Sequence, residues 1–187
     1  MKRIALFASG SGSNAENIIN YFTLKKTAVV TKVFCNNPNA KVFDRCKRLQ
    51  IDTVLFSKED FFNSDVVLNQ LKDVADYIVL AGFLLKIPST IIDAYPNKII
   101  NIHPALLPKY GGKGMYGMHV HNAVKENKDS ETGITIHFVN ENYDEGAIIF
   151  QATTKLENSD SVGVIAQKIH TLEYTHFPKV IESVILQ

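Results

Sequence analysis

Short apolar runs alternate with stretches of helical periodicity along the first half of the chain. The short β-rich run 2–8 stops at a cluster of Gly and Ser, and apolar residues then recur at helical spacing over 15–22. The pattern repeats, with strands expected at 28–35, 53–56 and 77–81 and helices expected at 40–49 and 61–74. Alternating strands and helices predict an α/β fold with a Rossmann-like, mostly parallel sheet and helices on both faces.

The second half begins with the same kinds of element and ends differently. Pro88 favours a short helix that reaches Tyr95, and the apolar run 98–100 is typical of a buried strand. Further elements are expected as a helix at 119–127, strands at 132–138 and 147–153, and a helix at 161–186. The polar turn 140–146 joins the two late strands, so we expect an antiparallel late strand. Pro178 is expected to kink or interrupt the last helix.

The strand at 98–100 leads into the stretch Asn101-Ile102-His103-Pro104-Ala105-Leu106-Leu107-Pro108. Strand alternation points Asn101 and His103 to one face. The two prolines remove backbone donors, so the chain is expected to leave the sheet here and form a defined loop. An amide and an imidazole suit acyl transfer, where both can act on a developing oxyanion. Without the prolines, a structural histidine would explain the N-x-H spacing about equally well.

A glycine loop, Gly10-Ser11-Gly12-Ser13-Asn14, lies between the first expected strand and the first helix. Backbone N–H groups at a helix N-terminus favour an anion. The loop fits a relaxed dinucleotide pattern, but the acid expected near 34–37 is absent, and no Walker motif occurs. These features favour a monophosphate over NAD, with a tight turn that needs glycine only for packing as the alternative.

Other polar residues follow in the second half. Asp144 lies in the turn after the strand that carries His137, and it suits two roles equally well. It could cap the turn, or it could orient an imidazole and move a proton. His119 and His121 resemble a metal-ligand pair, but no third ligand has a fitting spacing, so no metal is expected.

Composition narrows the possible partners. The 187 residues, 45% of them hydrophobic, can bury a full core, and we expect one domain over 1–187. Lys and Arg total 20 and Asp and Glu total 19, so the net charge of +1 argues against nucleic-acid and membrane partners. No apolar run reaches about 18 residues and no signal region precedes the first glycine, which favours a cytoplasmic protein.

The chain has no motif for covalent catalysis. It lacks a G-x-S-x-G elbow, and neither Cys35 nor Cys46 lies beside a candidate base in the sequence. The cysteines also lack metal-ligand spacing, so we expect reduced, mostly buried thiols. A direct transfer between two bound substrates is what the polar residues serve best.

Four motifs together point to a known family. The glycine loop 10–14, Ala81-Gly82-Phe83, the stretch 101–108 and the segment 133–146 resemble the 10-formyltetrahydrofolate-dependent formyltransferase family, and within it the phosphoribosylglycinamide formyltransferases. Their order and spacing match along nearly the whole chain. The resemblance implies that a formyl group passes from 10-formyltetrahydrofolate, a co-substrate, to the amino group of glycinamide ribonucleotide in de novo purine biosynthesis. The alternatives are formyl transfer to an amino-sugar nucleotide and a non-catalytic nucleotide-binding module.

The resemblance also implies roles for individual residues. Asn101 and protonated His103 would donate to the formyl oxygen, and Asp144 would raise the pKa of His103 and relay protons through water. The glycine loop would hold the phosphate, and Glu173 the ribose hydroxyls or the glycinamide end. Further substrate contacts are expected from Leu84, Pro104 and His170. His170 matches a polar phosphate partner of the family, with a solvated helix residue as the alternative.

For the folate, the resemblance implies mainly backbone contacts. These are expected around Leu84-Leu85-Lys86-Ile87 and the turn Asn140-Glu141-Asn142-Tyr143-Asp144, together with Asn101. Lys58 is similar to the basic residue that meets the folate tail, with a solvated lysine at a helix start as the alternative. Relatives commonly carry Met-Arg at the positions of Leu84 and Leu85. The family pattern divides the chain into a phosphate-binding part, about 1–97, and a folate and catalytic part, about 98–187.

One segment departs from the family pattern. The loop Lys109-Tyr110-Gly111-Gly112-Lys113-Gly114-Met115-Tyr116-Gly117-Met118 is longer and richer in glycine than in many relatives. We expect it to close over the ribonucleotide. We also expect a monomer or a weak homodimer.

Overall fold

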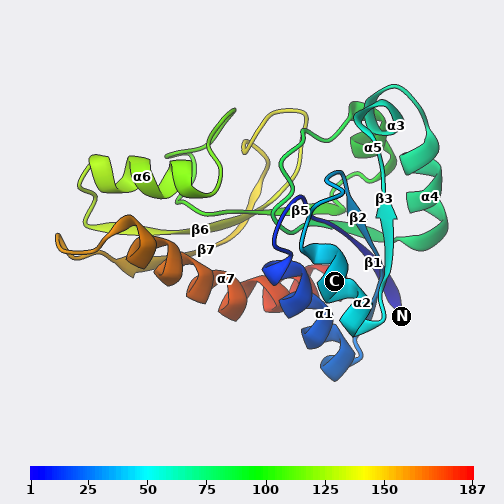
Figure 1. The fold of residues 1–187 in the computed structure, drawn as a ribbon, viewed down its shortest axis with the longest axis horizontal. Coiled ribbons are helices and arrows are strands. Elements are labelled where there is room, and N and C mark those ends of the chain that lie inside the picture. Colours follow the sequence, from blue (N-terminus) through cyan, green and yellow to red (C-terminus); the bar gives the residue numbers. More distant parts are fainter.

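A seven-stranded sheet runs through this computed structural model, which describes residues 1–187 (Figure 1). The strands are β1 (Lys2–Phe7), β2 (Ala28–Cys35), β3 (Asp52–Leu55), β4 (Tyr77–Leu80), β5 (Ile99–His103), β6 (Glu131–Phe138) and β7 (Ile148–Lys155). Their order in the sheet is β3-β2-β1-β4-β5-β6-β7. The first five strands are parallel to one another, whereas β6 is antiparallel to both β5 and β7. The expected fold class, including an antiparallel late strand, is confirmed.

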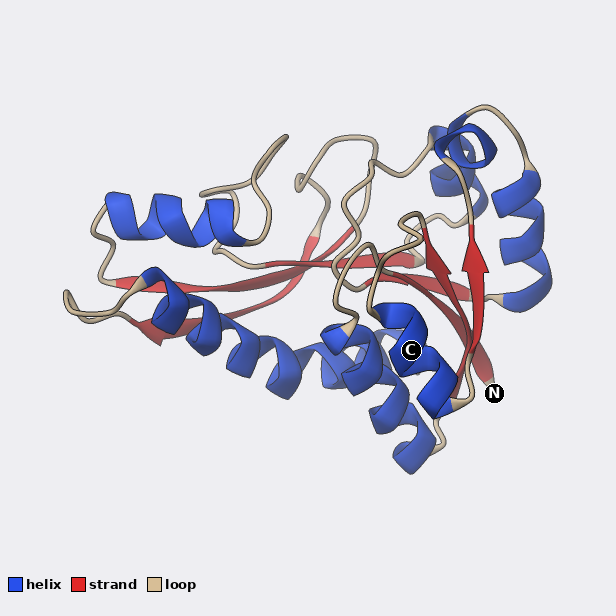
Figure 2. Cartoon of the chain, in the orientation of Figure 1, coloured by secondary structure: helices blue, strands red, loops and turns tan.

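Helices cover both faces of the sheet (Figure 2). The helices α1 (Ser13–Lys25), α2 (Val42–Leu49) and α7 (Val162–Ile185) contribute to one buried cluster, and α3 (Lys58–Phe62), α4 (Val66–Val74) and α5 (Ser89–Ala94) contribute to another. The remaining helix, α6 (Met118–Glu126), packs beside α7. None of the helices combines the length and apolar character that a membrane crossing requires.

The continuous apolar part of β1, Ile4 to Phe7, follows from its place between these two clusters. Ile4 and Leu6 face the cluster of α1 and α7, while Ala5 and Phe7 face the opposite one. Alternation therefore buries every one of these side chains, which is typical of a central parallel strand. Burial of each large side chain contributes roughly 1.5–3 kcal/mol relative to exposure.

Two expected elements differ from the structure. The helix expected at 61–74 is two helices, α3 and α4, separated by the polar residues 63–65. Apolar periodicity continued across this break, but Ser57 and Asp60 form a capping box that starts α3 earlier, at Lys58. The first helix is thereby set by hydrogen bonds that periodicity does not register.

Pro178 does not interrupt the last helix. The helix α7 is continuous from Val162 to Ile185 with Pro178 inside it. Proline cannot donate to the carbonyl four residues earlier, which belongs to Tyr174. The side-chain amide of Asn17, on α1, donates to that carbonyl at 3.1 Å instead. A neighbouring helix thus satisfies the acceptor that proline leaves free. Of the two expected alternatives the interruption was wrong, and the kink stays a prediction.

The strand order places several loops at one edge of the sheet. The strand β1 lies between β2 and β4, so the chain order reverses there. Ligands of open α/β sheets bind outside the carboxyl ends of the strands at such a switch point. The glycine loop follows β1, the segment 81–87 follows β4, and the stretch 104–108 follows β5.

Candidate active site

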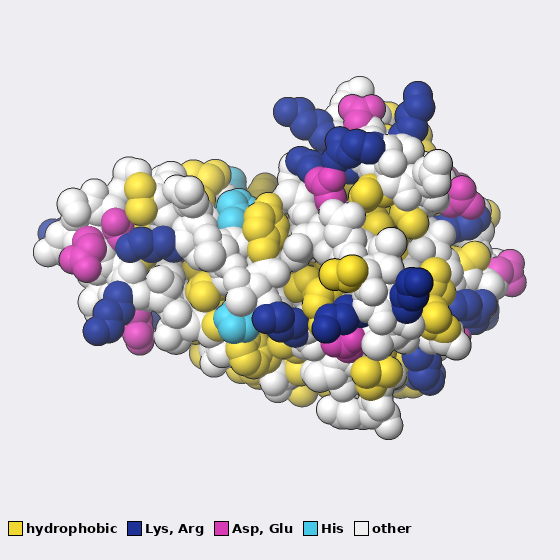
Figure 3. Space-filling model, turned by 90° about the horizontal axis from the view of Figure 1, so that it is seen from below, with side chains coloured by type: hydrophobic (Ala, Val, Ile, Leu, Met, Phe, Trp, Pro, Cys, Tyr) yellow, Lys and Arg dark blue, Asp and Glu magenta, His cyan; other side chains and the backbone are white.

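A cleft of about 610 Å³ opens at this edge of the sheet. Its walls come from the glycine loop, the segment after β4, the end of β5, the loop before α6, the turn after β6, and α7. Figure 3 shows a hollow between the two ends of the molecule, with histidine and hydrophobic side chains at its edge. Lys and Arg are spread over both ends of that face and form no continuous basic surface.

Most residues that the sequence singled out line the cleft, namely Gly10, Ser11, Gly12, Ser13, Asn14, Leu84, Leu85, Lys86, Ile87, Asn101, His103, Pro104, Asn140, Asn142, Tyr143, Asp144, His170 and Glu173. Lys58 and Glu141 are not part of the lining. Lys58 is the exposed first residue of α3, and Glu141 is exposed in the turn after β6. Their contacts with folate remain predictions.

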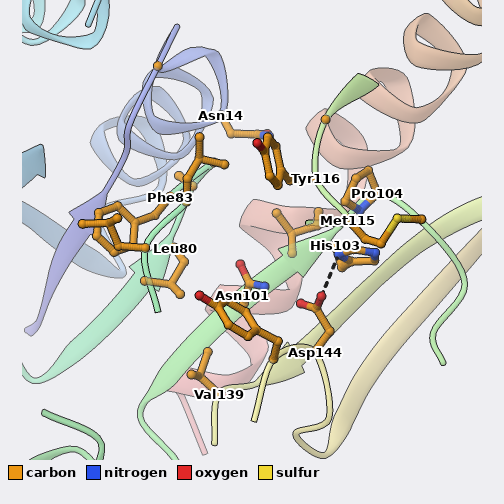
Figure 4. A pocket seen from close by; sticks show the side chains of 18 of the residues that line it. Asn14, Leu80, Phe83, Asn101, His103, Pro104, Met115, Tyr116, Val139 and Asp144 are labelled. Carbon is orange, nitrogen blue, oxygen red and sulfur yellow. Dashed lines mark ion pairs between the residues drawn. The ribbon is translucent and has the colours of Figure 1, made fainter. Parts of the chain in front are cut away.

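The three predicted catalytic side chains converge on one wall of the cleft (Figure 4). Asn101 and His103 come from β5, where alternation puts both on the cleft side. Asp144 comes from the turn after β6, and its Oδ2 lies 3.5 Å from Nδ1 of His103. The backbone N–H of Gly112 donates to the same Oδ2 at 3.0 Å. A loop amide therefore holds the carboxylate that faces the histidine.

The other nitrogen of His103 is already occupied. Nε2 lies 2.7 Å from the carbonyl oxygen of Tyr110, which can only accept, so Nε2 carries a proton. In the neutral ring Nδ1 is then the unprotonated atom. Because the 3.5 Å separation from Asp144 exceeds that of a charge-assisted hydrogen bond, this atom has no close partner. Nδ1 is the nitrogen available for proton exchange.

Burial and charge act in opposite directions on His103. Its burial lowers the pKa, and this outweighs the raising effects of Asp144 and of the Tyr110 carbonyl. Asp144 therefore acts on the His103 pKa in the expected direction, but burial outweighs it. Burial also acts to raise the pKa of Asp144, but the nearby rings of His137 and His103 and the N–H of Gly112 bring it below its ordinary value. Asp144 is an ionised carboxylate at neutral pH.

The sequence pattern assigns no role to His137, which lies on β6. Its Nδ1 donates to the carbonyl of Phe138 at 2.9 Å, so Nε2 of the neutral ring is an acceptor. The amide nitrogen of Asn101 lies 3.1 Å from this Nε2 and donates to it. This contact fixes which way the Asn101 amide points. It depends on the antiparallel register that pairs Asn101 with His137, and single-strand alternation carries no signal for that pairing.

The glycine loop presents unpaired donors. None of the backbone N–H groups from Gly10 to Ala15 donates to a protein acceptor, and no side chain caps α1. Gly12 has a left-handed backbone, with φ of 71°, at the N-cap position. Consecutive free N–H groups at a helix start form a site for an anion.

Polar residues from α1 and α7 meet beside this loop. Asn14 donates to Oε2 of the buried Glu173 at 2.9 Å, and Nδ1 of His170 lies 3.0 Å from the same oxygen. The hydrogen bond to Glu173 raises the pKa of His170 above its ordinary value despite partial burial. Glu173 is thus held by two partners and directed toward the cleft.

The loop 109–118 contributes several lining residues that sequence reasoning did not single out individually. Met115 and Tyr116 project into the cleft between the glycine loop and His103 (Figure 4). Other unpredicted lining residues are Leu80, Ile102, Lys113, His121 and Val139. These residues come from separate segments that only the packing of the loop and strands brings to the site, so the local sequence pattern carries no signal for them.

The two histidines of α6 lie in different surroundings. His121 is buried and lines the cleft, whereas His119 is exposed and packs edge-on against Tyr116. Burial lowers the pKa of His121. No group of three or more His, Cys, Asp and Glu side chains is placed to hold a metal ion.

Comparisons with known proteins converge on one family. The formyl transferase family model matches residues 2–181. Phosphoribosylglycinamide formyltransferase of Bacillus subtilis (strain 168) is 35% identical over 191 residues, which cover 99% of this chain and 95% of that protein. The crystal structure of glycinamide ribonucleotide transformylase 1 from Geobacillus kaustophilus has a TM-score of 0.89 at 34% identity and covers 98% of both chains. That of phosphoribosylglycinamide formyltransferase from Bacillus halodurans has a TM-score of 0.87 at 33% identity and covers 98% of this chain and 95% of that one.

Proposed function

The chain belongs to the formyl transferase family, and we propose that its cleft transfers the formyl group of 10-formyltetrahydrofolate directly to the amino group of glycinamide ribonucleotide. It is an enzyme of formyl transfer in purine biosynthesis and uses a folate-derived formyl donor. The reaction gives formylglycinamide ribonucleotide and tetrahydrofolate.

The convergence of Asn101, His103 and Asp144 in the middle of a two-ended cleft carries this proposal. One end has the unpaired N–H groups of the glycine loop, which suit a phosphate. The other end includes the segment 83–87 and the turn 139–144, which supply apolar surface and backbone groups for a flat ring. A cleft of this form holds two substrates with their reacting atoms near the catalytic residues, which makes direct transfer favourable.

The first chemical step is attack of the substrate amine on the formyl carbon. The new C–N bond forms as the carbonyl electrons move to the formyl oxygen. Asn101, whose amide is oriented by His137, donates to this oxygen through its second amide hydrogen. Negative charge developing beside Nδ1 of His103 favours the protonated ring. The ring therefore gains at Nδ1 the one proton that the attacking nitrogen releases, and the protonated ring donates a hydrogen bond to the oxyanion without transferring that proton to it.

Proton transfer completes the reaction. The nitrogen that attacked carries a positive charge and releases one proton, which water and ionised Asp144 pass to Nδ1 of His103. The same proton then reaches N10 of the folate as the C–N10 bond breaks and the formyl C=O re-forms. The carbonyl of Tyr110 keeps Nε2 protonated throughout, so Nδ1 alone exchanges protons.

The ribonucleotide lies along the glycine loop and α7. Its phosphate accepts from the free N–H groups, and Glu173 accepts from the ribose hydroxyls or the glycinamide end. His170 adds a positive charge near the phosphate when it is protonated. Leu84 and Pro104 complete this part of the wall, and the loop 109–118 closes over the bound ribonucleotide.

The folate lies against the opposite end of the cleft. Backbone groups of Leu84-Leu85-Lys86-Ile87 and of the turn 140–144 contact its ring system, and Asn101 meets the formyl group. Lys58 lies outside the cleft lining and would meet only the folate tail. Recognition by backbone groups tolerates Leu84 and Leu85 in place of other side chains, because peptide donors and acceptors are unchanged.

A purified-protein assay tests the proposal. The protein is incubated with 10-formyltetrahydrofolate and each acceptor in turn, and formylated product is measured by mass spectrometry. We expect product with glycinamide ribonucleotide and none with an amino-sugar nucleotide. Folded protein that formylates only the amino sugar, or binds nucleotide without turnover, would overturn the proposed substrate or the proposed activity respectively.

A further inference from the structure

The back of the glycine loop is held by α2. The backbone N–H of Val42 donates to the carbonyl of Gly10 at 3.2 Å, and Nε of Arg45 donates to the carbonyl of Ser11 at 2.7 Å. The contact with Val42 is close, because a Cβ built at Gly12 would lie 2.4 Å from its Cγ2. Glycine is therefore required at position 12 for the approach of α2 as well as for its positive φ.

These two hydrogen bonds determine where the loop amides point. In a trans peptide the C=O of one residue and the N–H of the next point in opposite directions. Holding the Gly10 carbonyl on the α2 side turns the N–H of Ser11 away from α2, and holding the Ser11 carbonyl does the same for the N–H of Gly12. Both N–H groups lack protein acceptors, and both residues line the cleft.

Arg45 and Arg48 both bind Glu16, which lies in the first turn of α1. Burial acts to raise the pKa of Glu16, but hydrogen bonds from Arg48 and Arg45 outweigh it, and the pKa lies below its ordinary value. The two arginines thus offset the negative charge of Glu16 beside the anion site. Only Arg45 also contacts the glycine loop, because its Nε reaches Ser11 while its terminal nitrogen binds Glu16.

We propose that Arg45 is a positioning residue for the binding of the ribonucleotide phosphate. By binding the Ser11 carbonyl it orients the Ser11–Gly12 peptide, and it does not touch the substrate. The inference rests on the proposed function, because it assigns the phosphate to the glycine loop. Loss of the Arg45 side chain lets the Ser11–Gly12 peptide rotate, so that an N–H meant for the anion is replaced in part by a repelling carbonyl oxygen. Affinity for the phosphate-bearing substrate falls, and the folate end of the cleft is unaffected.

A pair of variants separates orientation from charge. Arg45→Met and Arg48→Met each remove one positive charge and one partner of Glu16, but only the first removes the bond to Ser11. A hydrogen bond from a charged donor corresponds to about tenfold in affinity. We expect Arg45→Met to raise KM for glycinamide ribonucleotide about tenfold, with kcat and KM for 10-formyltetrahydrofolate changed less than about threefold. Arg48→Met should change all three less than about threefold.

Arg45→Lys tests the geometry further. Lysine keeps the charge but lacks the planar fork that binds Glu16 and Ser11 together. We expect KM for the ribonucleotide to stay raised in this variant. Equal KM increases in Arg45→Met and Arg48→Met, with full recovery in Arg45→Lys, would overturn the proposal in favour of a purely electrostatic effect. Thermal unfolding of all three variants identifies any that lose the fold.

A binding measurement distinguishes failure of this inference from failure of the proposed function. Inorganic phosphate is titrated into the protein while the backbone amide signals of Ser11 and Gly12 are followed by NMR. We expect saturable shifts in the unaltered protein and in Arg48→Met, and weaker binding in Arg45→Met. Phosphate binding that is equal in all proteins would overturn the role of Arg45. Absence of formyl transfer together with normal phosphate shifts would overturn the proposed function alone.

Discussion

The two ends of the cleft are built from different kinds of group. At the phosphate end the donors are backbone N–H groups of the glycine loop, and α2 holds them from behind through Val42 and Arg45. No side chain has to change its conformation before these groups can meet an anion. Recognition at this end is therefore organised before the ligand arrives, which reduces the entropy lost on binding.

The catalytic end is built from side chains whose partners lie in a loop. His103 donates to the carbonyl of Tyr110, and Asp144 accepts from the N–H of Gly112. Both loop residues belong to the segment 109–118, whereas Asn101 is fixed by His137 within the sheet. Catalytic geometry thus depends in part on the position of a glycine-rich loop, whereas the N–H donors for the anion are held by α2. The difference predicts that substitutions at the two ends have separable effects on turnover and on affinity.

The largest expected effect is a loss of kcat on substitution of Asp144. Asp144→Asn should fold normally and lower kcat at least about a hundredfold, because the amide can neither carry the charge beside His103 nor relay a proton. KM for the ribonucleotide should change little. Steady-state kinetics measure both values. Asp160→Asn, which removes a carboxylate paired with Lys168 outside the cleft, is the matched control. A near-normal rate in Asp144→Asn would contradict the assigned role.

A smaller effect on the same end is expected at His137. In His137→Leu the Asn101 amide loses the acceptor that orients it, and kcat should fall about tenfold. In His137→Gln the side-chain oxygen can accept from Asn101 and should recover part of the rate. Rates and far-UV circular dichroism of both variants are compared. Equal rates in the two folded variants would show that hydrogen-bond orientation is not what His137 contributes.

The loop itself provides a third test. With both substrates bound, trypsin cleavage after Lys113 should slow severalfold, because closure of the segment 109–118 buries its backbone. Cleavage after the exposed Lys26, at the end of α1 and outside the cleft, should be unchanged. Peptides are quantified by mass spectrometry over time. The same cleavage rate at Lys113 with and without ligands would rule out closure.

The smallest expected effect concerns pH at the phosphate end. Glu173 raises the pKa of His170, so the ring is protonated below that raised pKa and neutral above it. KM for the ribonucleotide should therefore increase about threefold as pH rises through this range, because a positive charge near the phosphate is lost. His170→Gln should flatten the dependence, and His176→Gln, on the same helix but outside the cleft, should retain it. An unchanged pH profile in His170→Gln would exclude a phosphate contact.

Most of the fold could be predicted because the pattern of apolar residues within each segment indicates which of its side chains are buried. The strand expected at 28–35 coincides with β2, and β1 was recognised from a run that is apolar on both faces. The expected helix boundaries were wrong where a polar contact, local or distant in the sequence, determined the structure and apolar periodicity did not. The capping box at Ser57 starts α3 at Lys58, earlier than periodicity indicated, and Asn17 satisfies the carbonyl that Pro178 leaves free inside α7.

By itself the sequence determined the α/β order of elements, the glycine loop at the start of α1, and the shared face of Asn101 and His103, because these depend only on neighbours along the chain. The tertiary structure alone decided how these parts meet. The strand register pairs Asn101 with His137, and packing of α2 aims the loop amides through Arg45. Burial also decided the net pKa of His103, since desolvation depends on every surrounding element and not on Asp144 alone.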